Sequence, residues 1–387
     1  MRLLPALLLA FTLHAQAQEN WSPMFNGRDL SGWVNVNCAP ETWSIKDGVI
    51  TCTGKPTGAL RTERQYENFI LEAEWRHLSS GGNSGVFIWG SPIAAPGVPF
   101  LRGIEVQVLD HGYATQYEQK TGKKPDWFTT HGDVFPIHGA TMNPIGRHKG
   151  SRSFPSEERS KPSPEWNHYR IECRAGSLRL SVNGKEVSGG DDCVYRKGYL
   201  ALESEGGPVE FRNVRIQELP PTGATPGQTA PLAQGHRSLY SGLDLRGWKT
   251  VTPEKWEPND WRLHLKAGHP GDPLWTEAEF GDCELIADLK VPGKSAIDAA
   301  ILLRDSSGTV TPVSLGPIMP RGGTPADEGI KWSAWNRVIV TLRGQGLVLT
   351  INDREFARQS IPAGKRAIGL LDFGGEAEFA NLFVRDL

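Results

Sequence analysis

Apolar and polar residues alternate in many short stretches of this chain. The alternation is clearest in 69–76, 169–174, 178–182 and 338–342, where every second residue is apolar. Because successive side chains of a β-strand point to opposite faces, this period of two predicts strands with one buried face. The dipeptide Asn183-Gly184 directly after one of them predicts a tight hairpin turn. Hardly any stretch has the period of a helix, so we expect an all-β protein built as a β-sandwich or jelly roll.

A set of motifs occurs twice along the chain, in the same order. The paired segments are 25–33 with 240–248, Trp166-Asn167 with Trp335-Asn336, Asn183 with Asn352, and Gly206-Gly207 with Gly374-Gly375. Order and spacing agree at several separate points, which indicates a duplicated domain. Between the copies, 219–232 is rich in proline, glycine and threonine and has no hydrophobic period, as is typical of a linker. We therefore expect domains at 20–219 and 236–387, joined by a linker over 220–235.

The first residues have the features of an export signal. Arg2 precedes an apolar run over 3–13, and Ala15-Gln16-Ala17 supplies the small residues that signal peptidase accepts. We expect 1–17 to be a cleaved signal peptide and the mature protein to be periplasmic or secreted. The apolar run is shorter than the about 20 residues that a transmembrane helix needs, so no membrane span is expected.

Charge and cysteine content restrict the partners and the compartment. The 42 basic and 44 acidic residues give a net charge of −2, and no long basic run offers a surface for nucleic acid or an anionic membrane. A small neutral partner is expected instead. In an oxidising compartment, the sequence positions favour two local disulfides, Cys38–Cys52 and Cys173–Cys193, with Cys283 left over.

The first copy is longer than the second between their shared tryptophans. The extra residues lie mostly in 111–164, which contains Trp127 and several histidines: His111, His131, His138 and His148. Long non-repeating loops on a rigid β scaffold often carry functional sites, although a surface insertion without function is the alternative.

Two segments of the first copy combine polar groups with small residues. The segment 81–89 contains Asn83 and Ser84 between glycines. In 103–110, alternation places Glu105 and Gln107 together on the face opposite the core. An ordinary solvated face would show the same pattern. The corresponding stretches of the second copy, 297–303 and 311–315, keep the apolar scaffold but lack these polar residues, which favours a site in the first copy.

These motifs resemble the 3-keto-disaccharide hydrolase family. The resemblance rests on Phe-Asn-Gly-x-Asp-Leu-x-Gly-Trp at 25–33, Asn83-Ser84-Gly85, Glu105-x-Gln107-x-x-Asp110, Glu165-Trp166-Asn167 and Asn183-Gly184. It covers nearly all of 20–219, whereas the second copy resembles only the framework motifs. The resemblance implies two concanavalin-A-like jelly-roll domains, with a sugar site on the concave sheet of the first. It also implies 3-keto-α-glucoside 1,2-lyase and 3-keto-2-hydroxyglucal hydratase activity.

The acidic residues of the segment 103–110 suit such chemistry better than ordinary glycoside hydrolysis. A glycosidase usually needs two carboxylates, about 5 Å apart for retention or about 6.5–9.5 Å apart for inversion. Here Glu105 is followed by the neutral Gln107, and Asp110 is out of phase, so the strand is a poor acid pair. A ketone at C3 of the sugar acidifies the C2 proton, so that one base can remove it. The C1 substituent then leaves by β-elimination, and water adds to the enone.

We predict the following roles for the candidate residues. Glu105 is the expected base, with His131 and His138 as further candidates for proton transfer. The expected substrate-binding residues are Asn83, Ser84, Gln107, Asp110, His111, Trp89 and Trp127, of which the tryptophans would stack on a sugar face. The sequence requires no cofactor, and a divalent metal stays open because the histidine spacing matches no strong metal motif. A carbohydrate-binding protein without catalysis and an ordinary glycoside hydrolase are the alternatives.

Overall fold

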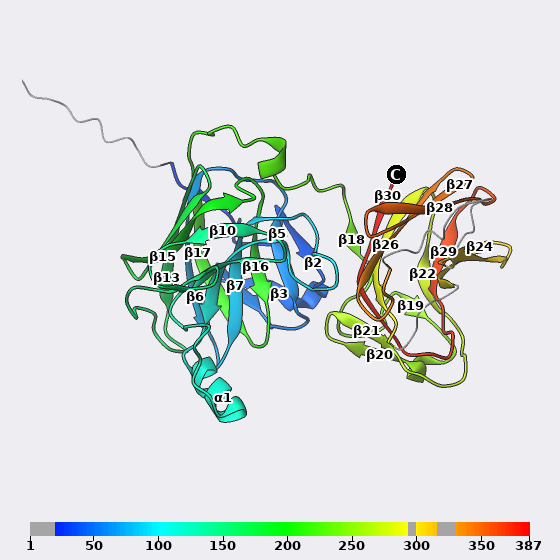
Figure 1. Ribbon diagram of the computed structural model, residues 1–387, viewed down its shortest axis with the longest axis horizontal. Coiled ribbons are helices and arrows are strands. Elements are labelled where there is room, and N and C mark those ends of the chain that lie inside the picture. Colours follow the sequence, from blue (N-terminus) through cyan, green and yellow to red (C-terminus); the bar gives the residue numbers. More distant parts are fainter. Residues whose placement is uncertain (1–19, 293–298, 316–329) are drawn as a thin grey trace, which may run out of the picture.

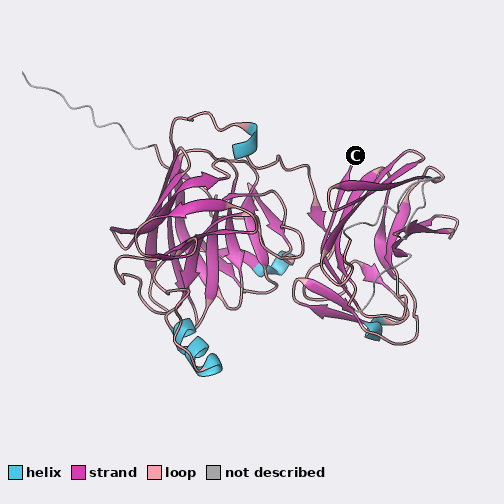
Figure 2. Cartoon of the chain, in the orientation of Figure 1, coloured by secondary structure: helices cyan, strands magenta, loops and turns pink. Residues whose placement is uncertain are grey.

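The chain folds into two all-β domains that lie side by side (Figures 1 and 2). The computed structural model describes residues 20–292, 299–315 and 330–387. The predicted signal peptide (1–17) and the first two residues of the segment 297–303 lie outside these residues. Each domain is a sandwich of two antiparallel sheets, which confirms the expected all-β jelly-roll class with two domains. Along the described part of the chain, no helix has the length and apolar composition needed to cross a bilayer.

The larger sheet of the first domain, sheet A, has the strand order β10-β15-β14-β13-β6-β17-β4-β3, with β1 paired to β17. Its strands are β1 (Ser22–Pro23), β3 (Trp43–Lys46), β4 (Val49–Cys52), β6 (Phe69–His77), β10 (Thr141–Pro144), β13 (Asn167–Arg174), β14 (Ser177–Val182), β15 (Lys185–Val194) and β17 (Val209–Glu218). The second sheet, sheet B, has the order β11-β12-β9-β8-β7-β16-β5-β2. Its strands are β2 (Trp33–Val36), β5 (Gly58–Thr62), β7 (Asn83–Gly90), β8 (Gly103–Leu109), β9 (Val134–Ile137), β11 (His148–Lys149), β12 (Arg152–Ser153) and β16 (Tyr199–Ser204).

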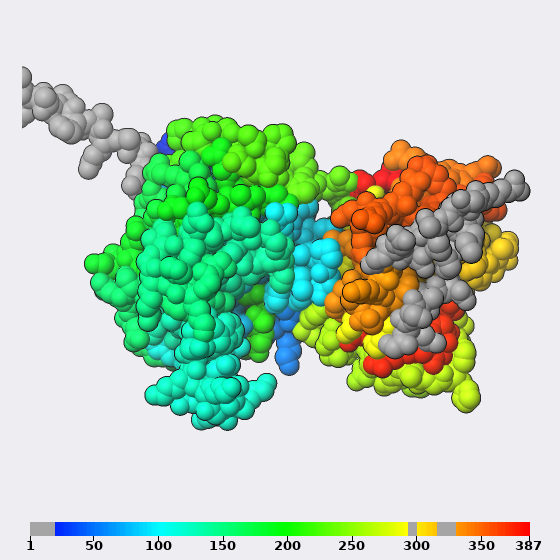
Figure 3. Space-filling view, in the orientation of Figure 1, coloured from blue at the N-terminus to red at the C-terminus, as the bar shows by residue number. Residues whose placement is uncertain are grey.

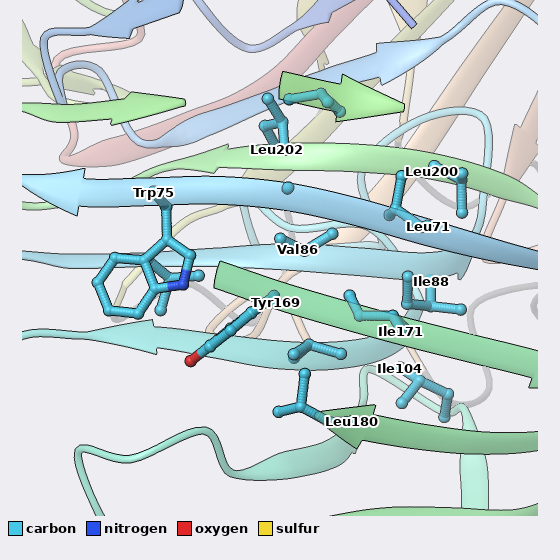
Figure 4. Close-up of a cluster of buried hydrophobic side chains, with 14 of the residues drawn as sticks. Leu71, Trp75, Val86, Ile88, Ile104, Tyr169, Ile171, Leu180, Leu200 and Leu202 are labelled. Atoms are coloured by element: carbon cyan, nitrogen blue, oxygen red, sulfur yellow. The ribbon is translucent and has the colours of Figure 1, made fainter. Parts of the chain in front are cut away.

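The core of the first domain lies between sheets A and B. Leu71 and Trp75 of β6 face Val86 and Ile88 of β7 across it, and all four are almost completely buried (Figure 4). Burying a side chain of this size contributes about 1.5–3 kcal/mol, so the alternation seen in the sequence supplies the main stabilising term. The same alternation turns every second residue of sheet B away from the core, onto the outer face of that sheet.

Local signals place the turns as predicted. Strand β14 ends directly before Asn183-Gly184 and β15 begins directly after it. Both turn residues have positive φ, 48° and 86°, as a two-residue type I′ hairpin requires. The sequence did not predict the helix α1 (Gly112–Thr121), which lies in the long insertion and ends at Gly122 in the left-handed conformation. Its apolar pattern is weak because none of its residues is buried.

The second domain repeats this arrangement on a smaller scale. Within the described residues, sheet C has the order β20-β21-β30-β23-β26-β27-β28, with β18 paired to β30, and sheet D has the order β19-β22-β29-β24-β25. The strands of sheet C are β18 (Arg237–Ser238), β20 (Trp256–Asn259), β21 (Arg262–Leu265), β23 (Cys283–Lys290), β26 (Asn336–Arg343), β27 (Gly346–Ile351), β28 (Arg354–Ser360) and β30 (Ala377–Asp386). Those of sheet D are β19 (Trp248–Lys249), β22 (Leu274–Phe280), β24 (Ala299–Asp305), β25 (Val310–Ser314) and β29 (Arg366–Leu370). Short 3₁₀ turns occur at η1 (Pro40–Thr42), η2 (Pro226–Gln228) and η3 (Pro253–Lys255).

Most of the segment predicted as a linker is held against the first domain. The carboxylate of Glu67 accepts the backbone N–H groups of Thr222 and Ala224 at 2.8 and 3.1 Å, and the N–H of Ala230 donates to the Lys197 carbonyl at 2.8 Å. Composition could not reveal these contacts because they are made mainly by backbone groups. After these contacts, the side chain of Leu232 is strongly exposed.

The five cysteines are buried free thiols, so the expected disulfides are not formed. Strand β14 lies between β13, which carries Cys173, and β15, which carries Cys193. Cys193 itself lies beyond the end of β14, where its backbone N–H donates to the Gly176 carbonyl at 2.9 Å. Cys38 follows β2 of sheet B, and Cys52 lies in β4 of sheet A. The positions of the cysteines along the sequence could not show whether their sulfur atoms meet.

Candidate active site

A cavity of about 250 Å³ opens on the outer face of sheet B in the first domain. It has an acidic floor and a largely aromatic wall. The lining residues are Asn83, Phe100, Glu105, Gln107, Leu109, Tyr113, Trp127, Phe128, Phe135, Ile137, His138, Arg152, Glu203 and Glu205. Half of them come from the insertion 111–164, including residues of α1, β9 and β12. The insertion is therefore part of the cavity wall.

Three glutamates form the floor. Glu105 lies on β8, while Glu203 and Glu205 come from β16 and the residue that follows it. Strand β7 separates β8 from β16, and its Gly85 leaves room for the side chains on both sides. A methyl group on Gly85 would lie 3.0 Å from Oε1 of Glu105 and 3.0 Å from Oε2 of Glu203. The two carboxyl oxygens are thus no more than twice that distance apart.

Burial and mutual repulsion make these glutamates hold their protons more tightly than usual. Burial, with the nearby charge of Glu205, raises the pKa of Glu105 to about 8. Burial, and to a smaller extent the charges of Glu105 and Glu205, raises the pKa of Glu203 well above its ordinary value. Burial, and to a smaller extent the charge of Asp260, raises the pKa of Glu205 to about 7. At neutral pH the floor therefore holds both a proton donor and groups close to their own pKa, the condition for general acid–base work.

A chain of polar contacts fixes the floor. The Gln107 amide donates to Oδ1 of Asn83 at 2.9 Å, and the Asn83 amide donates to Glu205 at 2.5 Å. At the other end, Arg152 donates to Gln107 at 3.4 Å and to the fully buried Asp133 at 3.0 Å. Oε2 of Glu203 is also buried, but it has no hydrogen-bond partner among the described residues. An unpaired buried oxygen on the cavity floor is suited to a substrate hydroxyl or a leaving oxygen.

Arg152 brings a positive charge to the cavity. It reaches the site from β12, a two-residue strand within the insertion. Its guanidinium lies 3.4 Å from the ring centroid of Phe135 and 5.3 Å from that of Trp127. Held between these rings and Asp133, the guanidinium is fixed in position while still lining the cavity.

The wall of the cavity is aromatic. Phe100 stacks on His138, with ring centroids 5.8 Å apart and an angle of 12° between the planes. Burial lowers the pKa of His138, which favours its neutral form. On the rim, Trp127 packs edge-to-face against Phe128 and Tyr117 and leaves 45% of its own surface exposed. The rim therefore presents an indole to whatever enters the cavity.

The structure brings together five of the predicted site residues: Asn83, Glu105, Gln107, Trp127 and His138. It places Ser84, Trp89 and Asp110 elsewhere. Ser84 is fully buried and donates to the backbone carbonyl of Glu203 at 2.8 Å. Trp89 lies in the core, with its indole N–H donating to the Glu67 carbonyl, so no sugar can stack on it.

Asp110 anchors the loops beside the cavity instead of lining it. Its carboxylate accepts the backbone N–H groups of Gly81, Gly112 and Ser163 at 2.7, 2.8 and 2.6 Å. Burial alone would raise the pKa of Asp110, but these donors outweigh it and lower the pKa.

His111 and His131 form a separate cluster around Ser160. The serine hydroxyl lies 2.9 Å from Nε2 of His111 and 2.8 Å from Nδ1 of His131, and it donates to the Thr130 carbonyl. Neither histidine lines the cavity. Among the residues that the structure describes, no three His, Cys, Asp or Glu side chains are grouped as a metal site would require.

The second copy lacks every glutamate of the floor. Strand pairing makes Leu302 of β24 the counterpart of Phe87, because each lies opposite the corresponding residues of β29 and β16. The partner of Phe87 on β8 is Glu105, and the partner of Leu302 on β25 is Pro312. By the same register, Leu371 and Phe373 stand where the first copy has Glu203 and Glu205. The fold is retained in the second copy, but the acidic floor is not.

Sequence reasoning missed Glu203, Glu205 and Arg152. Strand 103–110 supplies a single acid to the cavity, as expected, but the conclusion that the site lacks an acid pair was wrong, because Glu203 and Glu205 come from another part of the chain. A signal for the two glutamates was present: they lie one and three residues before Gly206-Gly207, and Phe373 and Leu371 occupy the same positions before the duplicated Gly374-Gly375. Arg152 has no such signal, because its insertion has no counterpart in the second copy.

Several known proteins are similar to parts of this chain. Residues 20–217 and 235–385 each match the family described as the 3-keto-alpha-glucoside-1,2-lyase-like domain. The 3-keto-disaccharide hydrolase of Bacteroides thetaiotaomicron is 21% identical over 252 residues, which cover 52% of this chain and 79% of that protein. Among solved structures, a candidate glycosyl hydrolase from Parabacteroides distasonis is 24% identical with a TM-score of 0.41, covering 52% of this chain and 95% of that one. A carbohydrate binding module from Bacillus subtilis is 15% identical with a TM-score of 0.34, covering 48% and 96%. Because the two matched segments make up most of its length, the chain belongs to the 3-keto-α-glucoside-1,2-lyase-like family and carries the family domain twice.

Proposed function

We propose that the first domain cleaves 3-keto-glucosides by elimination followed by hydration. The observation that carries the proposal is the convergence of Glu105 and Glu203 over Gly85, in the one copy that has an acidic floor. Family membership and the name of the Bacteroides relative support the choice of a 3-keto sugar as substrate.

In the first step, ionised Glu105 removes the C2 proton, which the C3 ketone has made acidic. A base with a pKa of about 8 is stronger than an ordinary carboxylate and suits this weakly acidic proton. Glu203, which stays protonated, gives its proton to the oxygen leaving C1. C1 and C2 are neighbouring atoms, so the base and the acid need to lie close together, as these two glutamates do.

The second step reverses these roles. Glu203, now ionised, takes a proton from water as the oxygen of that water bonds to C1 of the enone. Glu105, now protonated, exchanges its proton with the entering water and gives a solvent-derived proton to C2. The products are the 3-keto sugar and the free alcohol, and both glutamates regain their starting states. The net reaction is hydrolysis.

Arg152 is the group best suited to the negative charge that develops on the C3 oxygen. It is already fixed by Asp133 and two aromatic rings, so it needs little reorganisation during the reaction. We propose that Asn83 and Gln107 hold sugar hydroxyls and that the neutral imidazole of His138 contacts the ring from the wall. The half-exposed Trp127 would stack on the departing group at the rim.

A direct glycoside hydrolase is the second candidate, and the close glutamate pair favours it. Retaining glycosidases use two carboxyl groups about 5–5.5 Å apart. The distance limit set by Gly85 is compatible with such a pair. The aromatic wall alone would also suit a sugar-binding protein without catalysis.

One assay separates these functions. The full chain is incubated in D₂O with a disaccharide and, separately, with its 3-keto derivative, and products are reduced at once and analysed for deuterium. Elimination and hydration must place deuterium on C2 of the product from the 3-keto substrate, above the level of an enzyme-free control. Cleavage of the unoxidised disaccharide without deuterium at C2 would establish the direct hydrolase. Absence of cleavage with retained binding would leave a sugar-binding protein. A parallel reaction with a chelator tests for a metal.

We further propose that the protein acts outside the cytoplasm. The support is the signal-like sequence at 1–17. The intact mass of the exported protein should correspond to a chain beginning at Gln18, and retention of residues 1–17 would contradict the proposal.

A further inference from the structure

We propose that the second domain braces the wall of the sugar pocket and so sets how the first domain holds its substrate. The inference rests on the proposed function, but it concerns a different part of the molecule. One element that joins the two domains is the loop 91–102, between β7 and β8. Figure 3 shows the cyan surface of this part of the chain at the junction of the domains.

Side chains of the second domain hold the backbone of this loop. The N–H of Gly97 donates to the fully buried carboxylate of Asp288 at 2.8 Å. Arg337, which is paired with Asp288 at 2.8 Å, donates to the Ala94 carbonyl at 2.9 Å. The amide nitrogen of Asn381 lies 3.1 and 2.9 Å from two further loop carbonyls, those of residues 95 and 98. Four backbone groups of the loop therefore have their partners in the other domain.

The loop 91–102 also packs closely against the second domain. Gly97 has φ +70°, and a methyl group on it would lie 2.5 Å from Cγ of Trp335. Beneath the loop, an apolar cluster crosses the junction. It consists of Val36, Ala59, Phe87, Ala94, Leu101, Ala201, Ile286 and Phe383, with Phe100, Ile137 and Ile339 packed against it. The second domain thus covers the part of sheet B that adjoins the acidic floor.

Phe100 transmits this contact to the pocket. It belongs to the braced loop, packs on Phe87 with centroids 6.3 Å apart, and stacks on His138. Phe100, Ile137 and His138 all line the cavity. The brace therefore fixes the end of the pocket nearest the second domain. A pocket closed at that end takes a terminal sugar unit rather than the interior of a long chain.

The duplication supplies a matched control for testing this. Asn213 occupies in the first domain the position of Asn381 in the second, at the same bulge and with nearly the same φ, 52° against 49°. Each asparagine also donates to the equivalent acidic residue, Glu74 or Asp288. Asn213 is exposed and has no loop to hold. Asn213→Ala and Asn381→Ala both remove the bond to this acidic residue, and only Asn381→Ala also removes the contacts with 91–102 and the bond that the Asn37 amide donates to Oδ1 of Asn381 at 2.6 Å.

The experiment compares these variants in the full chain, measuring kcat and KM for a 3-keto-disaccharide together with amide hydrogen exchange. Asn381→Ala should raise KM about tenfold, change kcat no more than about threefold, and speed exchange in 91–102 and 134–138. Asn213→Ala should leave KM, kcat and the exchange of both segments unchanged. Phe100→Ala should raise KM similarly, and the double variant with Asn381→Ala should be no worse than Phe100→Ala alone, because both act through one contact.

Several results would overturn the proposal that the second domain braces the pocket wall. One is an Asn381→Ala variant with the KM and exchange of Asn213→Ala; another is faster exchange confined to 91–102. If Asn381→Ala does not fold, Arg337→Lys decides, since it keeps a charge beside Asp288 but loses the bond to the Ala94 carbonyl. Failure of the wild type to cleave any 3-keto-disaccharide would refute the proposed function alone. Exchange in 134–138 would then still show whether the brace reaches the pocket.

Discussion

Replacing Glu105 with glutamine should stabilise the protein at alkaline pH. In the folded chain, burial and the charge of Glu205 raise the pKa of this carboxyl from 4.5 to about 8. Between these two pH values the folded state holds a proton that the unfolded state has already lost. Because the unfolded state then binds fewer protons, stability falls as pH rises through this window.

The magnitude follows from the pKa difference. At about 1.4 kcal/mol per pKa unit, the ionised Glu105 costs the folded state at most about 5 kcal/mol above pH 8. Glutamine keeps the shape of the side chain and carries no charge. The free energy of unfolding of Glu105→Gln should therefore equal that of the wild type near pH 4.5 and exceed it by a few kcal/mol near pH 9.

Urea denaturation of both proteins at several pH values between 4.5 and 9 measures this difference directly. Taking the variant minus the wild type cancels distant groups such as His77, whose pKa burial lowers and whose effect has the opposite sign. A difference that stays flat, or that shrinks as pH rises, would refute the reasoning. It would mean that Glu105 is solvated or is paired with a cation.

Other changes test the site, the loops and the domain boundary. Glu203→Gln should lower kcat for a 3-keto-glucoside at least about 100-fold with little change in KM, since it removes the proton donor without changing shape; kcat within about threefold of the wild type would exclude Glu203 as the acid. Asp110→Asn should lower the free energy of unfolding by about 1–3 kcal/mol at pH 7, because the lowered pKa gives stability that is present above the ordinary pKa of 3.8 and lost on acidification; a loss persisting unchanged in acid would argue for a steric cause. Limited proteolysis should first cut near the exposed Leu232, and early cuts in 220–230 would show that the contacts of this segment with the first domain are weak.

The alternation of apolar residues and the duplication were enough to predict the fold. The alternation within β6 and within β14 predicts the buried face of each strand, and Asn183-Gly184 predicts the turn between β14 and β15. The site was only half predictable, since Glu105 and Gln107 share one strand and their common face can be read from the period. Glu203 comes close to Glu105 only through the pairing of β7 with strands on both its sides, a relation between segments about 100 residues apart.

For two of the histidines, the sequence predicted site residues that the structure places outside the cavity. His111 and His131 look like catalytic candidates because of their residue type, yet they share Ser160 as a hydrogen-bond partner outside the cavity. Side-chain type alone does not distinguish a loop anchor from a proton carrier. Arg152 illustrates the same limit, because its role depends on how a long insertion folds back over sheet B.

The contact between the two domains is heterologous, in that the outer face of sheet C in one module meets the outer face of sheet B in the other. Such a contact between like modules does not close on itself and can in principle propagate into a filament. At positions equivalent to the apolar Ile286 and Phe383 of the second module, the first module carries Glu72 and Arg215, which form an ion pair. A further module docking there would have to bury these charges. The ion pair therefore disfavours the docking of a third module on this side, and with it the growth of a filament.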